Sequence, residues 1–169
     1  MVVWRDLDLS TVDFAGARNG TSKFSIGNLP LRFQIPKGVV MYNGLSEYKS
    51  ITIEMPDQFC TWWRENLEPA LTSGLSPFSS NLKDKGLRLK VDKSTQIFDD
   101  NRKIQFPELT EGLFGGTTVT CIAEISGTYF FKDVHGLTCR IYQVVVHTES
   151  ETESEPEPTD TLKGFSFID

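Results

Sequence analysis

Basic and aromatic side chains are interleaved with apolar ones along the extended stretches of this chain. Arginine and lysine bind phosphate groups, and flat rings stack on nucleobases with roughly 1–3 kcal/mol per base. The mixture is therefore typical of a surface that binds a single-stranded nucleic acid. The candidate residues for this surface are Arg32, Tyr48, Arg88, Lys90, Lys93, Tyr129, Phe131, Lys132, Arg140 and Tyr142, with Tyr42, Phe98, Arg102 and Lys103 close by.

The competing interpretation is that these charges lie on ordinary solvated strand faces and that the rings belong to the core. Tyr129, Phe130 and Phe131 bear on the choice, because consecutive residues of a strand point to opposite faces of the sheet. At least one of these rings must therefore point away from the core. That ring either faces a ligand or is covered by another part of the protein.

Catalytic patterns are missing from the sequence. The two histidines, His135 and His147, have no cysteine nearby at metal-ligand spacing. The glycine-rich stretch 112–116 lacks the Lys-Ser/Thr pair of a phosphate-binding loop, so we expect a turn there. We therefore predict no enzyme activity, no metal site and no cofactor.

The acidic charge is concentrated at the C-terminal end. The formal charge of the 169-residue chain is −6, from 23 acidic and 17 basic side chains. Residues 148–169 hold seven of these acids and a single lysine, which leaves residues 1–147 neutral. Because 149–158 contains no apolar residue, it cannot repay the entropy cost of folding. We predict a neutral domain over 1–147 and a disordered acidic tail over 148–169 whose end is apolar.

Period-two alternation predicts the strands. Apolar residues alternate with polar ones at 31–35, 50–55 and 87–91, and two longer strand-like runs cover 117–132 and 137–147. The dipeptide Gly27-Asn28 between 22–26 and 29–36 predicts a hairpin. His135 falls between the two long runs, in an expected turn.

One helix is predicted among these strands. Across 57–71, one apolar stripe is formed by Phe59, Trp62, Trp63, Leu67 and Leu71. We expect Pro69 to end or kink the helix near residue 68. A single helix between short strands fits an all-β, OB-fold-like Greek-key barrel. The tryptophans of this helix are expected to face the barrel.

The cellular setting follows from the cysteines and from the absence of targeting signals. Cys60, Cys121 and Cys139 are widely spaced and odd in number, which favours reduced thiols and an intracellular location. No run approaches the roughly 20 apolar residues of a membrane span, and the N-terminus lacks a signal-peptide pattern. We therefore expect no membrane partner.

Two blocks of sequence carry a family resemblance. The first holds Leu7-Asp8-Leu9-Ser10, Leu31-Arg32-Phe33-Gln34-Ile35-Pro36 and Ser50-Ile51-Thr52-Ile53, and the second holds Gly127-Thr128-Tyr129-Phe130-Phe131 and Leu137-Thr138-Cys139-Arg140-Ile141-Tyr142. In this order they resemble a family of single-stranded DNA-binding proteins from large DNA viruses, which is similar to the OB-fold replication proteins of podovirus-type phages. Where that family more often has Trp, this chain has Cys139, so Cys139 is not a candidate for stacking.

The resemblance implies a sequence-tolerant single-stranded DNA-binding protein that acts at sites of viral or phage DNA replication, in the cytoplasm or the nucleus. In the phage proteins an acidic tail occupies the DNA groove and recruits replication partners. Here the corresponding partner would be a polymerase or a helicase, and the sequence leaves open a homodimer. The tail residues with this implied role are Glu149, Glu151, Glu153, Glu155, Glu157, Phe165 and Phe167.

Two other functions stay open at the level of sequence. One is a structural or interaction β-protein, such as a virion component, whose acidic tail only adds solubility. The other is an acidic chaperone that binds basic proteins through the tail itself. A measurement of single-stranded DNA binding distinguishes the DNA-binding function from both of these alternatives.

Overall fold

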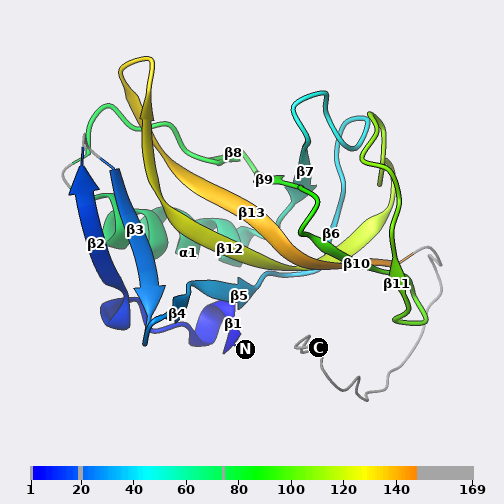
Figure 1. The fold of residues 1–169 in the computed structure, drawn as a ribbon, viewed down its shortest axis with the longest axis horizontal. Helices are drawn as coiled ribbons and strands as arrows, with labels where there is room; N and C mark the ends of the chain where they lie inside the picture. The colour runs from blue at the N-terminus through cyan, green and yellow to red at the C-terminus, as the bar shows by residue number, and fades with distance from the viewer. Residues whose placement is uncertain (1, 19–20, 74, 148–169) are drawn as a thin grey trace.

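The computed structural model describes residues 2–18, 21–73 and 75–147. These residues form β-strands packed against one helical segment (Figure 1), which confirms the predicted all-β architecture with an inserted helix. The predicted tail, 148–169, lies outside the described residues, and the domain boundary at 147 stays a prediction. No helix of the described part is long and apolar enough to cross a membrane.

Five strand paths close into a barrel. The first path consists of β5 (Arg32–Gln34) and its continuation β6 (Gly38–Val39). The other paths are β7 (Ser50–Glu54), β9 (Gly86–Lys90), β12 (Thr118–Phe131) and β13 (Val134–His147).

The pairing of these strands forms a ring. β5 and β6 pair with β12, β12 with β13, β13 with β9, and β9 with β7. A bridge between Val40 and Ile53 joins β7 back to the first path. Only β9 and β13 are parallel among these neighbours in the described chain. This order is a five-stranded Greek-key barrel of the OB-fold type, as predicted.

The inside of the barrel is filled by the predicted alternating residues. The apolar positions of the three predicted runs are at most 1% exposed, which confirms the period-two prediction. Their burial removes apolar surface from water, the main driving force for folding. These residues are Leu31, Phe33, Ile35, Ile51, Ile53, Met55, Leu87, Leu89 and Val91.

The helical segment consists of α1 (Asp57–Trp62), the π-helical turn η3 (Trp63–Leu67) and α2 (Glu68–Thr72). Four members of its predicted stripe are buried, and the fifth, Trp62, is partly buried. The ring of Trp62 contacts Phe33 of the barrel at a centroid distance of 5.6 Å. Pro69 does not end the helix near residue 68, because the helix continues to Thr72, and a kink there stays a prediction. Pro69 lies in the first turn of α2, directly after the widened π-helical turn η3.

The N-terminal part adds a second set of strands beside the barrel. β1 (Val2–Val3) runs parallel to β5, and the short 3₁₀ turns η1 (Trp4–Asp6) and η2 (Leu9–Thr11) follow. β3 (Thr21–Ile26) and β4 (Leu29–Pro30) form the predicted hairpin, with both turn residues, 27 and 28, at positive φ. The sequence pattern missed β2 (Asp13–Arg18), which pairs with β3.

The two longest strands run the length of the molecule in Figure 1, with β2 and β3 beside one end and β10 (Gln96–Phe98) and β11 (Ile104–Gln105) beside the other. The turn between β12 and β13 is Lys132-Asp133, both at positive φ. β13 therefore begins at Val134, and the prediction that His135 lies in a turn was wrong.

Candidate nucleic-acid interface

A groove of about 520 Å³ lies on the outer face of β7, β9 and β13. The strands supply Thr52, Arg88 and Lys90, and the loop between β6 and β7 supplies Tyr42 and Tyr48. In OB-folds the face of the second and third barrel strands, with the adjoining loops, is the usual site for oligonucleotides. The complete lining is Tyr42, Tyr48, Ser50, Thr52, Ser79, Ser80, Asn81, Lys83, Gly86, Arg88, Lys90, Tyr129, Leu137, Thr138 and Cys139.

The groove is basic, and no carboxylate of the described residues lines it. Its cations are Lys83, Arg88 and Lys90, and none of them forms an ion pair with any residue in the described ranges. Arg88 Nε donates a hydrogen bond to Ser50 Oγ at 3.1 Å, which steadies the guanidinium over the strands. The remaining guanidinium donors are available to a phosphate.

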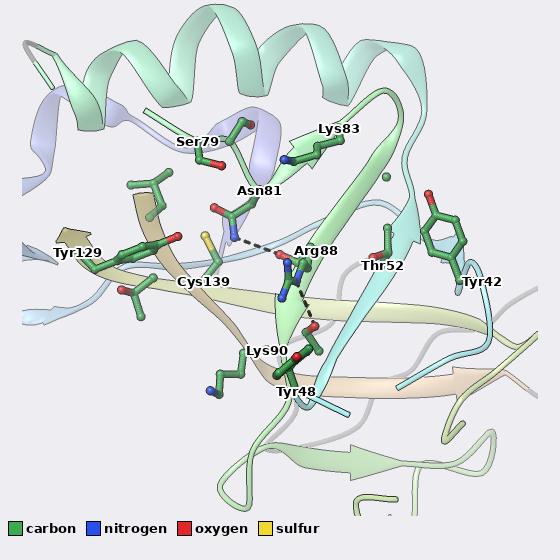
Figure 2. Close-up of a pocket in the computed structure, with 15 residues that line it drawn as sticks. Tyr42, Tyr48, Thr52, Ser79, Asn81, Lys83, Arg88, Lys90, Tyr129 and Cys139 are labelled. Carbon is green, nitrogen blue, oxygen red and sulfur yellow. Dashed lines mark hydrogen bonds between the residues drawn. The ribbon is translucent and has the colours of Figure 1, made fainter. Parts of the chain in front are cut away.

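Three tyrosines border the groove. Figure 2 shows Tyr129 and Tyr42 on opposite sides of Arg88, and Tyr48 below Arg88 in this view. The tyrosines are 42%, 78% and 69% exposed, respectively. Exposed rings at the edges of a basic groove are platforms on which unpaired bases can stack.

Tyr129 is positioned by a glycine on the neighbouring strand. Tyr129 and Gly136 are paired across β12 and β13, and the ring covers the glycine. A Cβ at position 136 would lie 2.4 Å from the phenol oxygen of Tyr129. Any larger residue at 136 would therefore displace the ring from its place beside the groove.

The loop that carries Tyr42 and Tyr48 is braced by the glycine-rich turn 112–116. Leu45 N donates to Leu113 O, and Gly112 N donates to Leu45 O, each at 2.8 Å. Gly44 has φ +85°, and a Cβ there would lie 2.6 Å from a backbone atom of this turn. The predicted turn is confirmed, and its role is to hold the tyrosine loop.

The opposite wall of the groove is the segment between α2 and β9, which includes β8 (Leu82–Lys83). Ser79 N donates to His135 O and Arg88 N donates to Asn81 O, each at 2.9 Å, so the wall is bonded to both β13 and β9. Sequence reasoning missed Asn81 and Lys83, because a two-residue strand shows no periodicity that could mark its exposed face.

Cys139 lines the groove but is only 5% exposed, and burial raises the pKa of its thiol. It is therefore a neutral part of the groove and no nucleophile. All three cysteines are free, as the sequence predicted, and all three are buried. In the part of the chain that the structure describes, no group of three His, Cys, Asp or Glu side chains is placed to hold a metal.

The structure brings four of the ten candidate residues into the groove: Tyr48, Arg88, Lys90 and Tyr129. Lys93 is exposed in the loop after β9, and Lys132 lies over the ring of Phe131 at 5.3 Å, at the tip of the β12–β13 hairpin. Tyr129, Phe130 and Phe131 are all exposed, so none of these rings is a core residue.

The other three candidates are Arg32, Arg140 and Tyr142. The two arginines join Glu124 and Asp92 in a network that we call the ion-pair row. Glu124 Oε1 accepts from Arg32 Nε at 2.8 Å and from Arg140 Nη1 at 3.3 Å. The guanidinium of Arg32 also lies 3.6 Å from the ring centre of Tyr142. Arg32 and Arg140 therefore already have acidic partners, and Tyr142 is covered by Arg32, whereas the groove cations have no acidic partner among the described residues.

The pair between Arg140 and Asp92 predicts a pH dependence of stability. Its hydrogen bonds lower the pKa of Asp92 to about 2. Because the pKa of Asp92 is lower in the folded chain than in the unfolded chain, the ionised carboxylate stabilises the fold at pH values above the unfolded-state pKa. This stabilisation is lost as the pH falls towards the folded-state pKa. We expect Asp92→Asn to lower the urea midpoint of unfolding more at about pH 6 than at about pH 3. An equal loss at both pH values would contradict the role of this pair.

No protein-family model and no curated protein sequence matches the chain. Its fold is similar to that of the single-stranded DNA-binding protein from bacteriophage Enc34, with a TM-score of 0.55 at 14% identity over 88% of this chain and 96% of that one. The same phage protein in complex with ssDNA has a TM-score of 0.54 at 13% identity, over 86% of this chain and 97% of that one. The C-terminal truncation of the phage protein has a TM-score of 0.53 at 12% identity, over 85% of this chain and 99% of that one.

These structures confirm the fold, and at such identities they show the fold alone. They are phage single-stranded DNA-binding proteins. The part of the resemblance that concerns large DNA viruses stays a prediction.

Proposed function

We propose that the protein binds single-stranded DNA along the groove, with little sequence preference, in DNA replication or recombination. Three cations that have no acidic partner in 2–18, 21–73 or 75–147 lie on one face of the barrel together with three exposed tyrosines. This combination is the observation that carries the proposed function. The cations would contact phosphates while the rings stack on bases. A base can stack on a tyrosine ring beside the groove only if it is unpaired, so we propose that the ligand is single-stranded.

The similarity of fold to a phage protein that was solved in complex with ssDNA supports the same proposal. The place of action would be the sites where viral or phage DNA is replicated. A homodimer stays a prediction.

The proposal is tested by titrating fluorescein-labelled oligo-dT with the protein and following fluorescence anisotropy. We expect saturable binding at low salt, weaker binding to a duplex, and a logarithm of affinity that falls linearly with the logarithm of salt. Three phosphate contacts predict a slope of about −2, since each contributes about 0.7 for single strands. Absence of saturable binding to oligo-dT would refute the function and favour the structural-protein alternative. Equal affinity for duplex would refute the strand preference.

We further propose that residues 148–169 compete with DNA for the groove and recruit a polymerase or a helicase. Their seven acidic residues carry the charge opposite to that of the groove cations, which have no acidic partner among the described residues. Phe165 and Phe167 supply apolar groups that a purely solvating segment does not need.

Deleting 148–169 is therefore expected to tighten binding of oligo-dT several-fold at about 50 mM salt, with a smaller effect at about 200 mM, because salt screens the competition. The measurement is the same anisotropy titration. A control chain in which Phe165 and Phe167 are replaced by serine keeps the charge and should keep the competition. Weaker DNA binding by the truncated chain would contradict it.

A further inference from the structure

The ion-pair row continues the line of the groove across the barrel. Lys90, which lines the groove, is paired with Arg140 on the next strand, and Arg140 is paired with Glu124. Glu124 is in turn paired with Arg32 on β5. Residues paired between adjacent strands lie on the same face of a sheet. A strand of DNA that passes over Arg88 and Lys90 therefore meets Arg140 next.

Arg140 presents its binding edge to a carboxylate. Nε donates to Asp92 Oδ2 at 2.9 Å and Nη2 donates to Asp92 Oδ1 at 3.0 Å. This two-bond arrangement is the one that arginine also uses with phosphate. The carboxylate of Asp92 thus occupies the position that a DNA phosphate would take on this guanidinium.

Asp92 is held in this position from the solvent side. Its Oδ1 also accepts hydrogen bonds from Ser94 N at 2.9 Å and Ser94 Oγ at 2.6 Å, so the loop after β9 fixes the carboxylate. The side chain of Asp92 is 38% exposed, whereas that of Arg140 is 15% exposed. The hydrogen bonds from Arg140 lower the pKa of Asp92 to about 2, so its carboxylate stays ionised at pH values at which an ordinary aspartate is protonated.

We propose that Asp92 is an internal phosphate mimic that closes a further phosphate-binding position at Arg140. The inference rests on the proposed function, since its ligand is a phosphodiester of the same DNA strand. The position at Arg140 is shut in the free protein and limits the DNA path to the groove. Removing the charge of Asp92 opens it and adds one phosphate contact.

The test compares the salt dependence of oligo-dT binding in full-length variants. Asp92→Asn keeps an acceptor for the Ser94 amide but loses the charge, and we expect it to steepen the salt slope by about 0.7 and to tighten binding several-fold at low salt. The control Glu65→Gln removes one negative charge from an exposed position on the helical segment and should leave the slope unchanged. Adding Arg140→Gln to Asp92→Asn should return the slope to that of the unaltered chain.

A second variant keeps the inference falsifiable if Asp92→Asn does not fold. Arg140→Gln alone should leave the slope unchanged, because Arg140 is closed when Asp92 is present. A slope shallower by about 0.7 in that variant would overturn the inference, since Arg140 would already contact DNA. An unchanged slope in folded Asp92→Asn would overturn it too. Either result leaves the proposed function intact, which fails only if the unaltered chain does not bind oligo-dT.

Discussion

Replacing Arg88 and Lys90 together with alanine is expected to weaken binding of oligo-dT by about 100-fold at low salt. Hydrogen bonds to charged groups contribute about 1.5–3 kcal/mol each, so a loss of roughly 3 kcal/mol for two such contacts is a conservative sum. The salt slope should become shallower by about 1.4, which corresponds to two phosphate contacts. Stability should change little, because neither side chain forms an ion pair with a described residue.

The matched control removes the same charges elsewhere. Arg5 and Lys37 are exposed and do not line the groove. Arg5→Ala/Lys37→Ala has the same net charge as the groove variant, so it isolates position from overall charge. Comparable losses of affinity in the two double variants would show that binding depends on net charge and not on the groove.

Replacing Glu124 with alanine is expected to lower the free energy of unfolding by about 2 kcal/mol. Removing one partner of a buried ion pair costs about 3–5 kcal/mol, and we reduce this value because the side chains of the row are partly solvated. Glu124 is 13% exposed and is shared by Arg32 and Arg140, so its loss leaves two guanidinium groups close together without their common carboxylate.

Urea unfolding followed by circular dichroism measures this effect. Glu65→Ala, an exposed helical position, should stay within about 0.5 kcal/mol of the unaltered chain. DNA affinity of the folded Glu124→Ala chain should not decrease, since the groove cations are untouched. If Glu124→Ala were as stable as the control, the ion-pair row would not support the fold.

Local patterns in the sequence were sufficient for the barrel and the helix. Strand alternation at 31–35 or 87–91 and the Gly27-Asn28 turn depend on neighbours a few residues away, so they can be predicted without tertiary information. β2 could not be predicted from the sequence, because Asp13–Arg18 contains none of the β-branched residues that are typical of strands. Pro69 does not end the helix, and the π-helical turn directly before it is a feature that the sequence does not reveal.

For the site, the sequence showed which residue types could bind DNA but not which of them already have partners within the protein. Arg88 and Arg140 look alike in sequence, as arginines on polar faces of strands. They differ because Arg140 meets Asp92, which lies 48 residues away in the chain, and Glu124. Long-range register decides such pairing, and single-sequence patterns do not contain it. The sequence placed Tyr42 and Tyr48 near the basic strands. Their position beside the groove depends on the hydrogen bonds between their loop and the turn 112–116, which the sequence does not show.

The most direct test of the groove as the DNA site is photo-cross-linking of oligo-dT in which 5-iododeoxyuridine replaces thymidine. Irradiation joins this base to an aromatic ring that lies against it, and mass spectrometry of the digested protein identifies the ring. We expect cross-links at Tyr42, Tyr48 or Tyr129, and their loss at high salt. Cross-links confined to exposed rings away from the groove, such as Phe14 or Phe106, would contradict the account.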